Sequence, residues 1–145
     1  MAAPDNKVVV IDCSAIMTLV FADEQSGMVE SLITEAVSES LTLLVPVLFW
    51  YEVCNVLQMA VIRKRLNQDD ASAALYHLTS LPLQTDDAPT PVIMMRISRF
   101  SAEYCLTAYD SAYLELAERN MADLITCDKA LAAAQKRCSG TGSRL

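Results

Sequence analysis

The stretch YDSAYLELAERN at residues 109–120, which continues as MADLITCD at 121–128, decides the fold. Its first part carries apolar residues at helical spacing with charged residues on the opposite side, which predicts a helix. Residues 124–127 are a short apolar run typical of a buried strand. Asp128 follows this run directly, and a second helix is predicted over 130–137. The chain therefore has the order strand, acid, helix at this point.

The same order opens the chain, where residues 8–11 (VVVI) predict a strand, Asp12 is the acid and Ser14 begins a helix. In an open parallel sheet, ligands bind outside the carboxyl ends of the strands, where the strand order reverses. If the two strands are neighbours, the carboxylates of Asp12 and Asp128 face one crevice. Thr126 points to the same face as Asp128 because strands have period two. Each acid therefore has a hydroxyl nearby that could orient it. The alternative is that both acids only cap helices.

Length and composition predict one domain over residues 1–145, because 53% of the residues are hydrophobic and can form a full core. Residues 139–145 are polar, contain two glycines and predict a mobile tail. The longest apolar run, 41–51, is too short to span a bilayer, and the start of the chain lacks a signal-peptide pattern. We therefore expect a cytoplasmic protein that does not contact a membrane.

Several classes of site are disfavoured by residue counts. The five cysteines are odd in number and lack a Cys-x-x-Cys pair, and His77 is the only histidine, which argues against disulfides, a Cys/His zinc site and a histidine triad. Three glycines leave no loop that could wrap a phosphate. A net charge of −7 argues against non-specific nucleic-acid binding. A carboxylate site that holds divalent cations could still engage phosphates, because the metal inverts the local charge.

The rest of the chain alternates strands and helices, which predicts an α/β fold with a parallel sheet. Asn67, Thr90 and Thr107 are predicted N-caps, and Pro91 suits the first position of a helix. Further strands are predicted over 41–45 and 81–84, and helices over 14–21, 28–37, 47–65, 67–80, 91–104 and 107–120.

Two more acids lie in the first turns of predicted helices. Glu52 is surrounded by apolar residues, and a buried lone carboxylate needs a partner or a cation. Its alternative role is a favourable interaction with the helix dipole. Asp110 lies three residues after Thr107, so its alternative role is in a capping box. The first turns of crossover helices lie at the same edge of the sheet as the strand ends. Glu52 and Asp110 could therefore converge there with Asp12 and Asp128.

Several carboxylates a few ångströms apart cannot all ionise unless a cation lies between them. Mg²⁺ and Mn²⁺ prefer carboxylate and water oxygens. Such a metal lowers the pKa of a bound water and stabilises charge on a phosphoryl oxygen. The reaction that best fits the four acids is phosphodiester hydrolysis.

The segments that contain the acids resemble the PIN domain family, and more narrowly the VapC-like toxins of bacterial toxin–antitoxin pairs. These segments are VVIDCSA (9–15), YEVCNVL (51–57), YDSAYL (109–114) and LITCD (124–128). The resemblance extends from residue 8 to about residue 137. It implies a three-layer, Rossmann-like α/β/α sandwich on a central parallel sheet and a Mg²⁺- or Mn²⁺-dependent endoribonuclease. It also implies a homodimer that is inhibited by a cognate antitoxin.

The resemblance maps the family's functional residues onto six positions. The acids map to Asp12, Glu52, Asp110 and Asp128, and the small hydroxyl residues map to Ser14 and Thr126. It implies that Asp12, Asp110 and Asp128 hold metal, and that Glu52 holds metal or positions the attacking water.

The sequence departs from the family at two places. Cys13 stands where the family usually has Thr or Ser, and no final edge strand is visible after Asp128. Candidates for holding RNA are the basic residues Arg63, Lys64, Arg96 and Arg99.

Two other functions compete with the nuclease. A PIN-like fold could act as a non-catalytic module that binds nucleic acid or protein, although the presence of all four acids argues against this. A receiver-type phosphoacceptor would need an acidic pair after the first strand, where only Asp12 is present.

Overall fold

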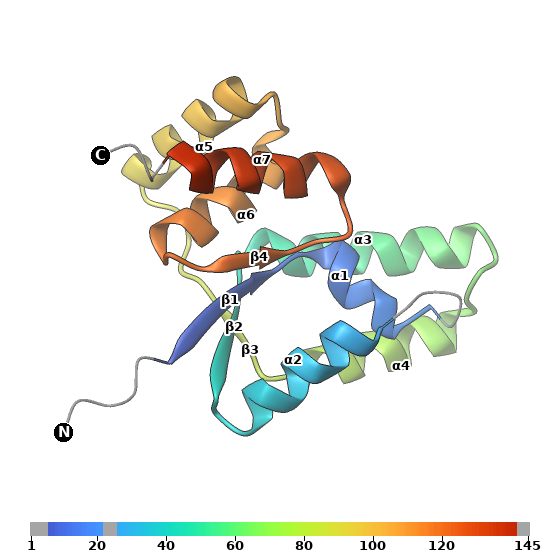
Figure 1. The fold of residues 1–145 in the computed structure, drawn as a ribbon. Helices are drawn as coiled ribbons and strands as arrows, with labels where there is room; N and C mark the ends of the chain where they lie inside the picture. The colour runs from blue at the N-terminus through green and yellow to red at the C-terminus, as the bar shows by residue number, and fades with distance from the viewer. Residues whose placement is uncertain (1–5, 22–25, 142–145) are drawn as a thin grey trace.

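The computed structural model describes residues 6–21 and 26–141, and its centre is a parallel sheet (Figure 1). The strands are β1 (Lys7–Ile11), β2 (Leu41–Val45), β3 (Leu83–Thr85) and β4 (Asp123–Ile125), in the spatial order β3-β2-β1-β4. Val9 of β1 pairs with Leu43 of β2 on one side and with Asp123 of β4 on the other. The first and last strands are therefore neighbours, as the site hypothesis required.

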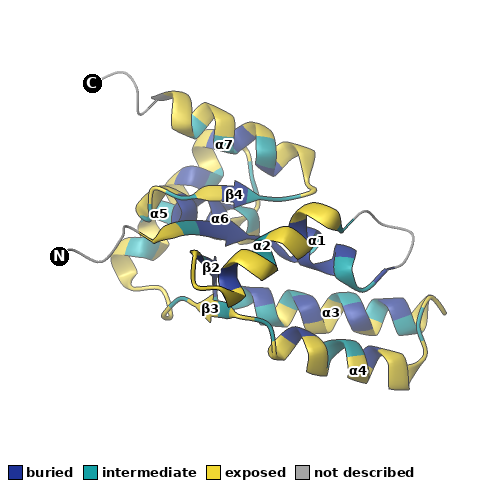
Figure 2. Ribbon diagram, turned by 60° about the horizontal axis from the view of Figure 1, so that its bottom comes forward, coloured by how far each residue is buried: buried dark blue, intermediate teal, exposed yellow. Residues whose placement is uncertain are grey.

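The chain moves from β1 to β2 to β3 and then returns to β4 on the far side of β1. Right-handed crossovers place the helices before and after this reversal on opposite faces of the sheet. Figures 1 and 2 show this arrangement, with α5, α6 and α7 on one side and α2 and α4 on the other. The helical segments are α1 (Cys13–Ile16), a 3-10 turn η1 (Met17–Leu19), α2 (Gly27–Val37), α3 (Leu48–Ile62), α4 (Gln68–Thr79), α5 (Pro91–Tyr104), α6 (Ala108–Arg119) and α7 (Lys129–Thr141).

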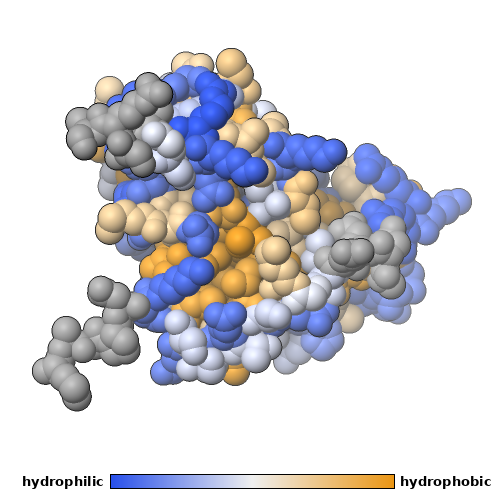
Figure 3. Space-filling model, in the orientation of Figure 1, coloured by the Kyte–Doolittle hydropathy of each residue, from blue (hydrophilic) through white to orange (hydrophobic). Residues whose placement is uncertain are grey.

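This arrangement confirms the predicted α/β fold with a central parallel sheet and helices on both faces. The two central strands are covered on both faces, as their near-continuous apolar sequences indicate. Val10, Ile11 and Val45 are fully buried, and the strands that contain them are dark in Figure 2. Figure 3 shows hydrophobic side chains gathered over the sheet, with hydrophilic side chains around them.

Local signals located the starts of three helices correctly. The side chain of Asn67 accepts a hydrogen bond from the amide of Asp70 at 2.8 Å. Thr90 caps α5 through the amide of Ile93 at 3.3 Å, and Thr107 caps α6.

Several predicted segments were wrong at their ends, among them the strand expected over 81–84, which spans Leu83–Thr85. The helix expected to reach Arg65 ends at Ile62, because Lys64 takes a left-handed conformation with φ of 59°. The helix expected over 14–21 divides into α1 and η1. The tail was expected to begin at residue 139, but α7 continues through Thr141. The alanine-rich first turns of this helix favour it. Residues 142–145 of that tail lie outside the described residues.

In the described part of the chain, none of the helices combines the length and apolarity needed to cross a membrane.

Candidate active site

Asp12 lies at the carboxyl end of β1, and three protein groups hold its side chain. Its Oδ1 accepts hydrogen bonds from Ser14 Oγ at 2.7 Å and from the Ala15 amide at 3.0 Å. Its Oδ2 accepts a hydrogen bond from Thr126 Oγ1. The residue is only 6% exposed. Asp12 therefore does cap α1, as the alternative interpretation predicted, but its carboxylate is also tied to the neighbouring strand.

The two hydroxyl residues join the loop after β1 to the loop after β4. Ser14 Oγ accepts a hydrogen bond from the Cys127 amide at 2.9 Å, and Thr126 Oγ1 accepts one from the Asp128 amide at 2.9 Å. We expected each hydroxyl to orient its own nearby acid. Instead, both hydroxyls donate to Asp12, and Thr126 contacts only the backbone of Asp128.

Glu52 lies in the second turn of α3 and is half-buried. Its Oε1 accepts a hydrogen bond from the hydroxyl of Tyr113 at 2.8 Å. Sequence reasoning treated Tyr113 only as an apolar contact of its helix. A signal was nevertheless present, because a buried tyrosine hydroxyl needs a partner and Tyr113 lies one helical turn after Asp110.

Asp110 and Asp128 each use one carboxylate oxygen in a hydrogen bond at the start of a helix; Thr107 is the N-cap of α6, and Asp128 caps α7. Asp110 Oδ2 accepts a hydrogen bond from Thr107 Oγ1 at 3.0 Å, and Asp128 Oδ1 accepts one from the Leu131 amide at 2.8 Å. Among the residues that the structure describes, the second oxygens of Glu52, Asp110 and Asp128 accept no hydrogen bond. These hydrogen bonds thus leave one oxygen available on each of Glu52, Asp110 and Asp128.

Electrostatic repulsion couples the four carboxylates, through its effect on the pKa values of Asp12 and Glu52. Burial raises the pKa of Asp12 despite its hydrogen bonds, and the charge of Asp128 raises it further. Burial also raises the pKa of Glu52, and repulsion from Asp12 and Asp110 adds to the shift. Charge repulsion therefore links the acids in the order Asp128, Asp12, Glu52, Asp110.

Cys13 follows Asp12 in the chain and is buried, with only 4% of its surface exposed. Burial, followed by the charges of Glu52 and Asp12, raises the pKa of its thiol to about 12. The thiol therefore stays protonated at neutral pH and packs as a small apolar group. It is poorly suited to ligate a metal, since the thiolate is the ligating form.

The donor set at this edge fits a hard divalent cation, because it offers carboxylate oxygens that repel one another. Within residues 6–21 and 26–141, no three Asp, Glu, Cys or His side chains already form a group that could hold a metal ion. Both oxygens of Asp12 face protein donors, and each other acid turns one oxygen towards a hydroxyl or an amide.

Of the four basic residues considered for RNA, two follow α3 and two lie on α5 with partners of their own. Arg63 and Lys64 follow the last turn of α3, whereas Glu52 lies near its start. Arg96 Nε donates to Glu115 at 3.1 Å, and its Nη2 pairs with Glu118. The Arg99 guanidinium lies 5.4 Å from the centre of the Phe100 ring.

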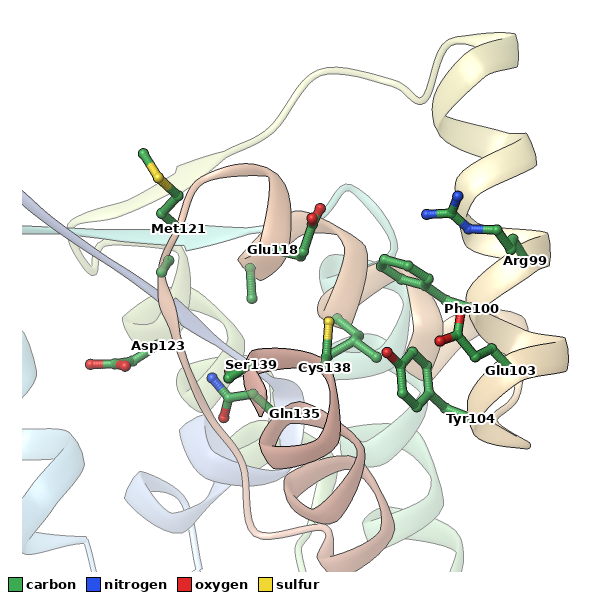
Figure 4. Close-up of a pocket in the computed structure, with 13 residues that line it drawn as sticks. Arg99, Phe100, Glu103, Tyr104, Glu118, Met121, Asp123, Gln135, Cys138 and Ser139 are labelled. Carbon is green, nitrogen blue, oxygen red and sulfur yellow. The ribbon is translucent and has the colours of Figure 1, made fainter. Parts of the chain in front are cut away.

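Arg99 also lines a cavity of about 460 Å³ between α5, α6, α7 and the start of β4 (Figure 4). Cys138 and Tyr104 lie side by side in this cavity, and Asp123 points away from them. None of the four acids lines it.

Comparisons with known proteins agree with this arrangement. The family model for the PIN domain matches residues 9–137. Ribonuclease VapC3 from Pyrobaculum aerophilum is 32% identical over 123 residues, which cover 85% of this chain and 91% of the relative. The crystal structure of PAE2754 from the same organism superposes with a TM-score of 0.70 at 25% identity, covering 90% of this chain and 80% of the other. The chain therefore belongs to the PIN domain family, as a VapC-like member.

Proposed function

We propose that this chain is a Mg²⁺- or Mn²⁺-dependent endoribonuclease that acts in the cytoplasm as the toxin of a toxin–antitoxin pair. The observation that carries the proposal is the electrostatic coupling of four carboxylates at the β1–β4 edge, with an oxygen free on three of them. The relative Ribonuclease VapC3 is similar over most of both chains, which supports RNA as the substrate.

The metal is held by Asp12, Asp110 and Asp128, and Glu52 holds metal or orients the attacking water. When bound, the cation supplies a water of lowered pKa and neutralises charge on the phosphoryl oxygen. Ser14 and Thr126 keep Asp12 in one orientation through their hydrogen bonds. Because the chain is acidic overall, RNA affinity depends on this local site rather than on bulk charge.

The proposed partners are RNA, a cognate antitoxin and a second copy of the chain. Support for a homodimer comes from an apolar groove of about 330 Å³ between α3, α5 and α6. Tyr51 and Tyr109 line this groove and are 74% and 68% exposed. Exposed tyrosine side chains that line an apolar groove are typical of protein interfaces.

Cleavage of RNA with and without Mn²⁺ tests the enzyme proposal. Wild type should cut RNA only with the metal, and Asp12→Asn, Asp110→Asn and Asp128→Asn should abolish the activity. Asp69→Asn on α4 is the matched control, because Asp69 is exposed in the first turn of a helix and belongs to no acid group. Activity of the three site variants equal to that of this control would overturn the proposal.

The toxin role has a separate test. Expression of the chain should arrest growth, and co-expression of the reading frame that lies upstream of its gene should restore it. RNA binding without cleavage by the wild type would instead support the non-catalytic module.

A further inference from the structure

Tyr113 is among the most deeply buried large side chains, with 1% exposure, yet its hydroxyl reaches the acid edge. We propose that Tyr113 is a positioning residue for the metal site: its hydroxyl holds Glu52 Oε1 and leaves Oε2 for a divalent cation. This inference rests on the proposed function and names a residue that acts through Glu52.

Glu52 differs from Asp110 and Asp128 in that its single donor comes from another helix, whereas theirs come from the start of their own helices. Three donors hold Asp12, and Asp128 is held by the start of its own helix. Glu52 accepts its hydrogen bond from Tyr113 alone among the described residues. Its helix α3 follows β2, whereas α6 follows β3 on the return to β4, so the bond joins the two helical layers across the sheet edge.

Helix α6 brings both a repelling group and a donor to Glu52. Asp110 and Tyr113 are three residues apart and therefore lie on the same face of this helix. The charge of Asp110 opposes the Glu52 carboxylate, whereas the Tyr113 hydroxyl favours it. Burial and the neighbouring Glu52 raise the pKa of Tyr113, so the hydroxyl remains a donor across the physiological pH range. The hydroxyl therefore has a fixed role in setting the position of Glu52.

The test compares Mn²⁺ binding by Tyr113→Phe and by Tyr104→Phe, measured by electron paramagnetic resonance of free Mn²⁺ without RNA. Both substitutions remove a hydroxyl from a buried tyrosine, but Tyr104 lies in α5 away from the acids. Removal of a group that orients a metal ligand typically weakens metal affinity by about 10- to 100-fold. We expect a loss in this range for Tyr113→Phe and wild-type affinity for Tyr104→Phe.

A second comparison uses Glu52→Gln as the background. If Tyr113 acts through Glu52, adding Tyr113→Phe to Glu52→Gln should weaken Mn²⁺ binding no further. Equal affinity of Tyr113→Phe and wild type, or an undiminished loss in the Glu52→Gln background, would overturn the inference while leaving the nuclease intact. Failure of the wild type to bind Mn²⁺ or cut RNA would overturn the proposed function itself.

Discussion

The buried carboxylate of Glu115 allows a quantitative prediction about the layer formed by α5 and α6. Glu115 is 1% exposed and accepts hydrogen bonds from Arg96 Nε at 3.1 Å and from Arg119 Nε at 3.1 Å. Each arginine also has a second acidic partner, Glu118 for Arg96 and Asp86 for Arg119. The perturbation is Arg96→Met, which keeps an unbranched apolar stem and removes one of the two cations from Glu115.

The magnitude follows from what remains around Glu115. A hydrogen bond to a charged group contributes about 1.5–3 kcal/mol, and Arg96 is 31% exposed, so we expect a loss of about 2 kcal/mol for Arg96→Met. We expect a similar loss for Arg119→Met. In the double variant no cation remains beside the buried carboxylate, so the second substitution breaks the buried pair and should by itself cost about 3–5 kcal/mol, in addition to the first loss. The second substitution should therefore cost more than the first.

Urea unfolding followed by circular dichroism measures these changes as differences in the free energy of unfolding. Arg99→Met is the control, because Arg99 lies on the same helix and its described contact is a cation–π contact worth about 0.5–1 kcal/mol. The reasoning is refuted if Arg96→Met and Arg99→Met destabilise the chain equally. A double variant whose loss equals the sum of the single losses would also refute it.

Three further predictions concern the site and its surroundings. Burial and neighbouring carboxylates raise the pKa values of Asp12 and Glu52. In EDTA, which removes metal, the stability that these two groups contribute at acid pH should therefore be lost as the pH rises above about 4 through their raised pKa values. The melting temperature measured by thermal unfolding should fall less with rising pH for Asp12→Asn than for the wild type. Parallel plots of melting temperature against pH for the two proteins would contradict this. Thr126→Val removes a donor to Asp12 and should reduce Mn²⁺ affinity by about 10-fold or more, measured by calorimetry; wild-type affinity would count against the role of this hydroxyl. Tyr51→Glu, in the groove, should dissociate the proposed dimer in sedimentation experiments, whereas Met121→Glu, at a 97% exposed position outside the groove, should not; equal effects would remove the groove from the interface.

Elements that depend on local chemistry could be predicted from the sequence. The caps at Asn67, Thr90 and Thr107 follow from the preferences of residues within four positions. These signals needed no knowledge of distant contacts. The order strand, acid, helix predicted a crevice shared by Asp12 and Asp128 only if their strands were neighbours, and the sheet order met that condition.

In the described part of the chain, four helices are closed by left-handed residues that are not glycine, and one of these ends was misplaced: α3 was expected to reach Arg65, whereas α2, α5 and α6 end within one residue of the predicted positions. The left-handed residues are Glu39, Lys64, Cys105 and Met121, with φ values between 50° and 59°. A left-handed conformation costs a residue with a Cβ roughly 1–2 kcal/mol, so sequence patterns give little warning of it.

Long-range contacts explain the remaining differences. The last strand was predicted to reach residue 127 but ends at Ile125, because Thr126 and Cys127 leave the sheet to bond Asp12 and Ser14. The role of Tyr113 was missed for a related reason. Its partner is 61 residues away on a helix of the other layer, and no local pattern contains that information.

The adjacency of β1 and β4 has a consequence for biosynthesis. A ribosome makes β1 long before β4, so β1 lacks this neighbour until residues 123–125 have been added. Nascent or truncated chains that stop short of this point cannot assemble the carboxylate edge. Asp12 therefore waits for more than a hundred further residues to be translated before Thr126 can bond it.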